Sequence, residues 1–241
     1  SGYTADKERG ATTGAEVILR DGISIDGPEA AVQHLEQFAF PVIEQQIADF
    51  DADGTIKDLL AREHLAQEEI GPAMLKVPYG CVRFPHFAYS MYGYQAYFMA
   101  YALYPDVIEK HFRLQADLAV QHNTAVARAY TDHNLPPMIR LDHDMADSRG
   151  TLVRVETLDK LWFPHFARAI APMLKTNVKM IWHCDGALME MVPRLLDCGL
   201  QGFQGFQYED GMDYEKICQM KTGDGEDLLI IAGISVTTTL P

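Results

Sequence analysis

The sequence lacks long apolar runs and lacks an excess of positive charge. No stretch approaches the roughly 20 apolar residues that cross a bilayer, and the N-terminus has no apolar core of the kind found in a signal peptide. The chain carries 34 acidic and 20 basic residues, a formal net charge of −14. Such a balance argues against a nucleic-acid binder and against a polybasic protein of the membrane surface. We therefore expect neither nucleic acid nor membrane among its partners.

Cysteine is also scarce and shows no metal-binding or disulfide spacing. The four cysteines stand at positions 81, 184, 198 and 218, and none belongs to a CxxC pair. Isolated cysteines of this kind are typical of reduced thiols, so we expect a cytoplasmic protein. Its length of 241 residues is enough for one large domain with a substantial core.

The second half of the chain alternates short apolar runs with amphipathic ones, which is typical of β/α units and a parallel sheet. Expected strands cover residues 138–144, 178–185, 200–207 and 228–234, with helices over 157–174, 188–196 and 213–220. Ala73–Val77 reads as an earlier strand, and another is possible near Val17. The predicted fold class is α/β, a (β/α)8 TIM barrel that is incomplete at both ends in this chain, because a closed barrel needs eight strands. Residues 73–241 would form the barrel domain, and residues 1–72 would form loops and helices that pack on it.

The first half reads as largely helical. A helix is expected from Pro28, with an interruption at Pro41 and a second segment to Ala48. The acidic turn 49–54 resembles a calcium loop, but position 12 is Leu60, so a polar cap on the next helix fits better. Residues 84–104 are rich in tyrosine at helical spacing. They predict a buried helix, whose rings, Tyr92 among them, would alternatively line a pocket for a planar ligand.

Polar residues close each later strand, and the clearest case is VKMIWHCDG at 178–186. Because side chains alternate along a strand, His183 and Asp185 share one face and Cys184 lies on the other. In MIRLDHD, by the same rule, Arg140, Asp142 and Asp144 share one face and His143 the opposite one. The following strands end in Gln204, Gln207 and Glu209, and in Ser235 and Thr237.

Carboxylates, an imidazole and amides at one rim of a barrel suit metal binding or proton transfer. Structural roles remain open for the same residues. Asp144 and Asp185 are suitable caps for the helices that follow, and Arg140 with Asp142 is a suitable interior ion pair. Cys184 is expected to be a small core residue. Several strands with the same kind of ending favour a functional site at this rim.

The segments MIRLDHDMADSRG, VKMIWHCDGALMEMVPRLLDCGLQGFQGFQYEDGMD and LLIIAGIS together resemble the uroporphyrinogen decarboxylase-like superfamily, and GYQAYFM at 93–99 fits the stretch before its long helix. This superfamily comprises the decarboxylase and the corrinoid-linked methyltransferases. The resemblance covers about residues 75–241 and implies a (β/α)8 barrel with its site at the C-terminal rim. It also implies a chain that lacks the opening strand and is shortened at its end.

The resemblance implies a methyltransferase more than a porphyrinogen decarboxylase, because the arginine-rich opening motif of the decarboxylase is absent. Family methyltransferases hold zinc with His-x-Cys and a later cysteine. Here His183 matches the histidine, and Asp185 replaces the cysteine. His183 and Asp185 would hold zinc or handle protons, with Asp144 as a further catalytic group.

Four further residues are expected to contact the substrate or the loop beside it: Gln207, Arg149, His143 and Tyr92. The implied methyl donor or acceptor is a corrinoid (methylcobalamin) on a partner protein, or a small-molecule methyl carrier, with a thiol or a pterin on the other side. A homodimer is implied by the family. The alternatives are a porphyrinogen decarboxylase of tetrapyrrole biosynthesis and a non-catalytic barrel that binds a tetrapyrrole or corrinoid.

Overall fold

The computed structural model describes residues 18–232, and the chain forms two compact units. The first unit combines Ser1–Phe50 with Pro85–Leu118, and the second combines Asp51–Phe84 with Ala119–Pro241. Each unit is therefore built from two separate stretches of sequence. The expected boundary between residues 72 and 73 lies inside the second unit, and the domain division drawn from the sequence stays a prediction.

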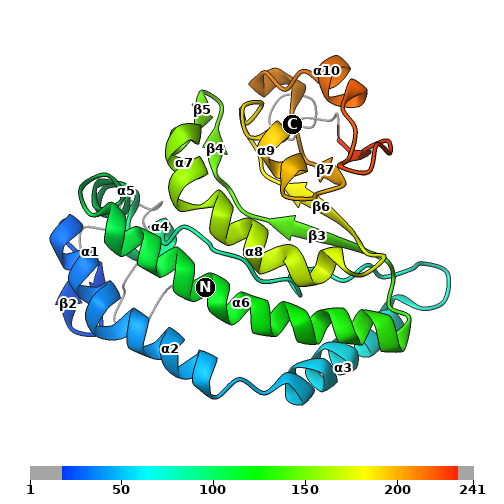
Figure 1. The fold of residues 1–241 in the computed structure, drawn as a ribbon, viewed down its shortest axis with the longest axis horizontal. Coiled ribbons are helices and arrows are strands. Elements are labelled where there is room, and N and C mark those ends of the chain that lie inside the picture. Colours follow the sequence, from blue (N-terminus) through cyan, green and yellow to red (C-terminus); the bar gives the residue numbers. More distant parts are fainter. Residues whose placement is uncertain (1–17, 233–241) are drawn as a thin grey trace. The chain divides into compact units, whose positions relative to one another are not determined.

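A parallel four-stranded sheet organises the second unit (Figure 1). Its strands follow one another in chain order, β3-β6-β7-β8, and every neighbouring pair is parallel. They are β3 (Met138–Asp142), β6 (Lys179–His183), β7 (Gly202–Gln204) and β8 (Leu229–Ile231). The helices between them are α7 (Val155–Leu161), α8 (Phe163–Leu174), α9 (Val192–Asp197) and α10 (Tyr214–Gln219), with a 3-10 turn at Tyr208–Asp210. This confirms the predicted alternation and gives a mixed α/β unit.

Aromatic side chains form the core beside β6. The three central residues of β6 are buried, and Trp182 is fully enclosed. The Trp182 ring meets that of Phe166 on α8 edge-on, with centroids 5.4 Å apart, and lies 6.0 Å from Trp162. Aromatic rings bury more apolar area than other side chains, so this cluster fixes α8 against β6.

The strand expected at Ala73–Val77 is wrong. Those residues lie in an irregular segment, in which Met74 and Leu75 are largely exposed. The Gln67 side chain instead hydrogen-bonds to the backbone of this segment. Its oxygen accepts from the Lys76 amide at 2.9 Å, and its nitrogen donates to the Met74 carbonyl at 2.8 Å. The chain meets the sheet slightly later, through an isolated parallel bridge between Tyr79 and Arg140.

Two long helices also contribute to the second unit. α3 (Ala52–Ile70) begins after Asp51, whose side chain accepts from the Gly54 amide at 2.9 Å. The acidic turn thus caps a helix, as predicted. α6 (Pro105–His133) begins at a proline and runs from the first unit into the second. A short antiparallel pair, β4 (Ala146–Asp147) and β5 (Gly150–Thr151), follows β3.

The first unit begins with a hairpin and a continuous helix. β1 (Leu19–Arg20) and β2 (Ile23–Ser24) are joined by Asp21 and Gly22, both with positive φ, as a tight hairpin requires. α1 (Pro28–His34) passes through a π-helical turn (Leu35–Ala39) into α2 (Phe40–Ala48). The expected interruption at Pro41 is therefore wrong. A wider π turn changes the hydrogen-bonding partners, so the missing amide hydrogen of the proline is accommodated.

The aromatic stretch folds as two helices, not one. α4 (Tyr89–Tyr92) ends at Gly93, whose φ of 88° breaks the helix, and α5 (Tyr94–Leu103) follows. Tyr97 and Tyr101 are buried around Phe87, in agreement with a predicted core role. None of the helices described between residues 18 and 232 is long and apolar enough to cross a membrane. Val17, Ser235 and Thr237 lie outside the described residues.

Candidate functional site

Three neighbouring strands bring polar side chains to one edge of the parallel sheet. In the strand register Asp142 stands beside His183, and His183 stands beside Gln204. All three residues are the last of their strands. Because the strands are parallel, these C-terminal ends meet at the same edge, where α/β proteins place their sites.

Two carboxylates and one imidazole converge at this edge. Each of Asp142, Asp144 and His183 offers one ligand-type atom, and these atoms lie within 4.8 Å of one another. His183 and Asp142 are partly buried, with side chains 16% and 26% exposed, whereas Asp144 is exposed. We call these three residues the acid–imidazole cluster.

Hydrogen bonding fixes the orientation of His183. Its Nδ1 lies 3.1 Å from the backbone carbonyl oxygen of Gln204. A carbonyl oxygen only accepts, so Nδ1 carries the hydrogen and, in the neutral ring, Nε2 keeps its lone pair. Nε2 faces Oδ1 of Asp142 at 4.0 Å. In its neutral form the imidazole would therefore present the Nε2 lone pair to Asp142.

Gly205 allows this close approach. Its φ is +94°, and a Cβ at this position would lie 2.5 Å from Nδ1 of His183 and 3.1 Å from Oδ1 of Asp185. A glycine is thus required both by the backbone conformation and by the space that the imidazole fills.

Asp142 is held by two donors on one oxygen. Its Oδ2 accepts from the Tyr79 hydroxyl at 2.8 Å and from Arg140 at 2.7 Å. Arg140 also donates to the Gln204 side chain at 3.0 Å, and its guanidinium lies over the Tyr79 ring, 4.6 Å from the centroid. The expected Arg140–Asp142 ion pair is present at the site edge. Tyr79 was not predicted from the sequence as a site residue, because it lies just after Ala73–Val77, the segment that was expected to be a strand and is not one.

The electrostatics of Asp144 differ from those of an ordinary surface aspartate. Partial burial is the main cause that raises the pKa of Asp144, and the neighbouring Asp142 and Asp185 raise it further. His183 and a backbone hydrogen bond from Asp185 act in the opposite direction. Asp185 therefore lies close to the acid–imidazole cluster, although the three mutually close ligand atoms belong to the other residues.

Cys184 points away from the cluster. It is fully buried, and its sulfur accepts from the Met145 amide at 3.3 Å. Burial is the main cause that raises the pKa of its thiol to about 12. The strand alternation thus assigned it correctly to the core.

The remaining predicted residues occupy separate positions. His143, the residue after β3, is buried edge-on to the Phe84 ring, and Gln207 is buried after β7. Arg149 is exposed and pairs with Asp147 at 2.7 Å within the β4–β5 turn. Contact of these side chains with a substrate stays a prediction.

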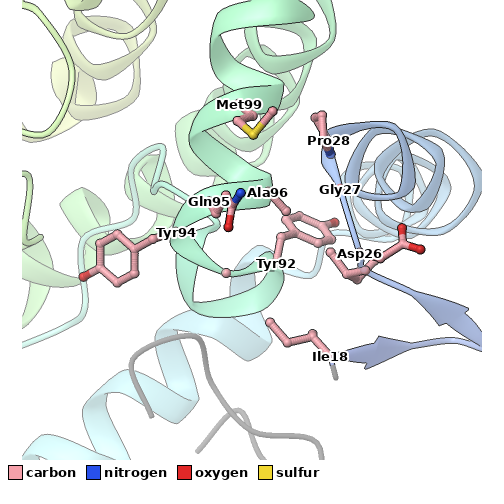
Figure 2. A pocket seen from close by; sticks show the side chains of 11 residues that line it. Ile18, Asp26, Gly27, Pro28, Tyr92, Tyr94, Gln95, Ala96 and Met99 are labelled. Atoms are coloured by element: carbon pink, nitrogen blue, oxygen red, sulfur yellow. The ribbon is translucent and has the colours of Figure 1, made fainter. Parts of the chain in front are cut away.

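Tyr92 belongs to the first unit. Its hydroxyl lies 2.8 Å from Nδ1 of His34, whose Nε2 lies 2.8 Å from Asp21. Tyr92 also lines a pocket of about 430 Å³ together with Asp26 and residues of α5 such as Gln95 (Figure 2). A pocket walled by an aromatic ring is thus present, and its ligand stays a prediction.

Comparison with known proteins gives a structural likeness alone. No protein-family model matches the sequence, and no curated protein matches it. A solved structure of a methyltransferase from Methanosarcina mazei is similar over 76% of this chain, with a TM-score of 0.53 and 15% sequence identity. The match covers 49% of that protein, so this chain spans about half its length. At this identity the likeness shows a shared fold, and the function has to be argued from the site.

Proposed function

We propose that this chain is a methyl-transferring enzyme of the uroporphyrinogen decarboxylase-like superfamily, and that its sheet forms part of a (β/α)8 barrel. The methyl donor would be a methylated corrinoid on a partner protein, and the acceptor a thiol or a pterin. The motif segments of the resemblance coincide with β3, β6 and β7. The similar solved structure is that of a methyltransferase, which agrees with the proposal.

The acid–imidazole cluster carries the proposal. Two carboxylate oxygens, of Asp142 and Asp144, and one imidazole nitrogen of His183 lie within 4.8 Å of one another. Acceptors this close repel unless a cation lies between them, and a metal ion or a proton meets that need. Imidazole nitrogen and carboxylate oxygen are both zinc ligands, so the donor set fits a zinc ion.

The proposed ligands differ from those that the sequence suggested. His183 is common to both sets. Asp185, which replaces the family cysteine, lies beside the cluster and acts on Asp144, while Asp142 and Asp144 offer the converging oxygens. Oxygen ligands are harder than thiolates, so other divalent metals compete better with zinc here.

Each cluster residue has a chemical task in this proposal. A bound zinc ion would lower the pKa of the acceptor thiol and favour the thiolate. His183, fixed through Nδ1, would direct its Nε2 lone pair at the ion. Asp144 is the exposed member of the cluster, which would place its carboxylate within reach of an incoming thiol. It would take the proton that the thiol releases.

Metal content and methyl transfer test the proposal together. We expect about one divalent metal ion per chain in the purified protein, lost in His183→Ala and in Asp144→Ala. His64→Ala is the matched control, because His64 lies on α3 with its side chain 73% exposed. Asp185→Ala separates the two ligand sets, since it should reduce metal content less than Asp144→Ala.

Activity is measured as the thiol-dependent demethylation of methylcobalamin, followed by absorbance. Demethylation that is lost with the metal supports the proposal. A metal-free protein that binds porphyrin tightly contradicts it and favours the decarboxylase. Corrinoid binding without metal or turnover contradicts it in favour of a non-catalytic barrel.

A further inference from the structure

The two oxygens of Asp142 have different surroundings. Oδ2 accepts two hydrogen bonds, from the Tyr79 hydroxyl and from Arg140, while Oδ1 is the oxygen that faces Nε2 of His183 at 4.0 Å. A carboxylate that accepts two hydrogen bonds on one oxygen cannot rotate without breaking both hydrogen bonds. It presents the other oxygen in a fixed direction.

Arg140 is itself fixed from two sides. One nitrogen bonds Oδ2 of Asp142 and another bonds the side-chain oxygen of Gln204. The Tyr79 ring lies beneath the guanidinium at 4.6 Å, a distance at which a cation and an aromatic face attract each other. Arginine is suited to this arrangement, because its planar fork reaches two acceptors at once.

The same network reaches the imidazole. Gln204 binds Arg140 through its side chain and accepts from Nδ1 of His183 through its backbone oxygen. Residues from three strands and one loop are thus connected in a single chain of hydrogen bonds. Such partners around metal or proton ligands usually set the orientation of the groups that do the chemistry.

We infer that Tyr79 and Arg140 are positioning residues, which fix Oδ2 of Asp142 so that Oδ1 faces Nε2 of His183. The inference rests on the proposed function for its catalytic consequence. The positioning itself is a property of the protein without metal or substrate, so it can be measured separately.

The main variant is Tyr79→Phe, which removes one hydroxyl and leaves the ring under Arg140. Tyr79 is half exposed on a loop, so the fold should tolerate the change. Arg140→Lys keeps the charge and loses the fork. Tyr104→Phe is the matched control, because it removes a tyrosine–carboxylate hydrogen bond of similar length, 2.9 Å to Glu29, in the first unit.

The first readout is the ¹⁵N NMR signal of the His183 imidazole in metal-free protein, identified by its loss in His183→Ala. In Arg140→Lys, and to a smaller extent in Tyr79→Phe, the carboxylate is no longer held with Oδ1 toward the imidazole, and the Nε2 signal should shift from its wild-type position. Tyr104→Phe should match the wild type. Signals that coincide in all these proteins overturn the inference.

The second readout is the visible spectrum of bound Co²⁺, which reports ligand number and geometry, together with steady-state kinetics. Tyr79→Phe should change the spectrum and lower kcat roughly 10- to 100-fold, with the thiol KM unchanged. An unchanged spectrum and kcat overturn the inference while the proposed function stands. A wild type without metal or turnover, but with the expected NMR changes, supports the positioning and removes the proposed reaction.

Discussion

Replacement of Gly205 by alanine tests the packing behind His183 most directly. The new methyl group would lie 2.5 Å from Nδ1 and 2.7 Å from Cε1 of the imidazole. Non-bonded carbon and nitrogen atoms do not approach so closely, so the ring has to move. Movement away from Gly205 also breaks the bond from Nδ1 to the Gln204 carbonyl.

The expected loss of folding stability in Gly205→Ala has a conformational part and a steric part. A non-glycine residue in the left-handed region costs about 1–2 kcal/mol. Loss of the hydrogen bond adds about 1 kcal/mol, and the steric contact adds a cost of similar size. Gly211→Ala supplies the conformational part alone, because Gly211 has a φ of +83° and no atom within 4 Å of the added methyl. Gly205→Ala should therefore be less stable than Gly211→Ala by about 2 kcal/mol.

Urea unfolding of the two variants measures this difference as a shift of midpoint at constant slope. The unfolded-state entropy that alanine removes is common to both variants and cancels. Gly205→Ala should also weaken metal binding roughly 10- to 100-fold, whereas Gly211→Ala should leave it unchanged. Equal stabilities and equal metal affinities would refute the close packing of Gly205 on His183.

Two further predictions concern buried titratable groups. Burial lowers the pKa of His111 to about 4, below the value of about 6.5 for an unfolded chain. The unfolded state therefore binds more protons between pH 6.5 and 4, and stability falls as the pH drops through this window, by about 3 kcal/mol in total for His111. His111→Phe should therefore flatten the curve of urea midpoint against pH in this window. Part of the slope should remain, because burial also lowers the pKa of His122 to about 4. An unaltered slope would contradict a buried neutral His111. Iodoacetamide should modify the exposed Cys218 and spare the buried Cys184 in the folded protein. Peptide mass spectrometry measures both rates of modification, and equal rates would contradict the burial of Cys184.

Local sequence signals predicted the sheet well because its strands are short apolar runs between amphipathic helices. β3, β6, β7 and β8 all lie within the ranges expected from the sequence. Ala73–Val77 has the same apolar character and does not form a strand, because the Gln67 side chain takes the nearby backbone groups. The five residues themselves do not indicate that a side chain on the preceding helix will hydrogen-bond to their backbone in place of a neighbouring strand.

Helix boundaries were predicted less well where a single residue decides between two geometries. Pro41 reads as a break, but a π turn carries the helix past it. Gly93 reads as one position of an aromatic helix, yet its positive φ ends α4 there. In both cases the residue type permits more than one backbone geometry, so the local sequence does not decide between them.

For the candidate site, alternation separated the buried Cys184 and His143 from the partly exposed His183 and Asp142, but it gave no information on which strands are neighbours. The pairing of His183 with Asp185 follows from one strand alone. The closer group forms across strands, because the register sets Asp142 beside His183. Tyr79 joins it from 63 residues away, a contact that no local pattern contains. The Asp142–His183 pairing is predictable in principle once the strands are taken as parallel and in chain order, because polar residues that end consecutive strands then become neighbours. The last residues of β3, β6 and β7 are therefore better candidates for one site than two residues of the same strand.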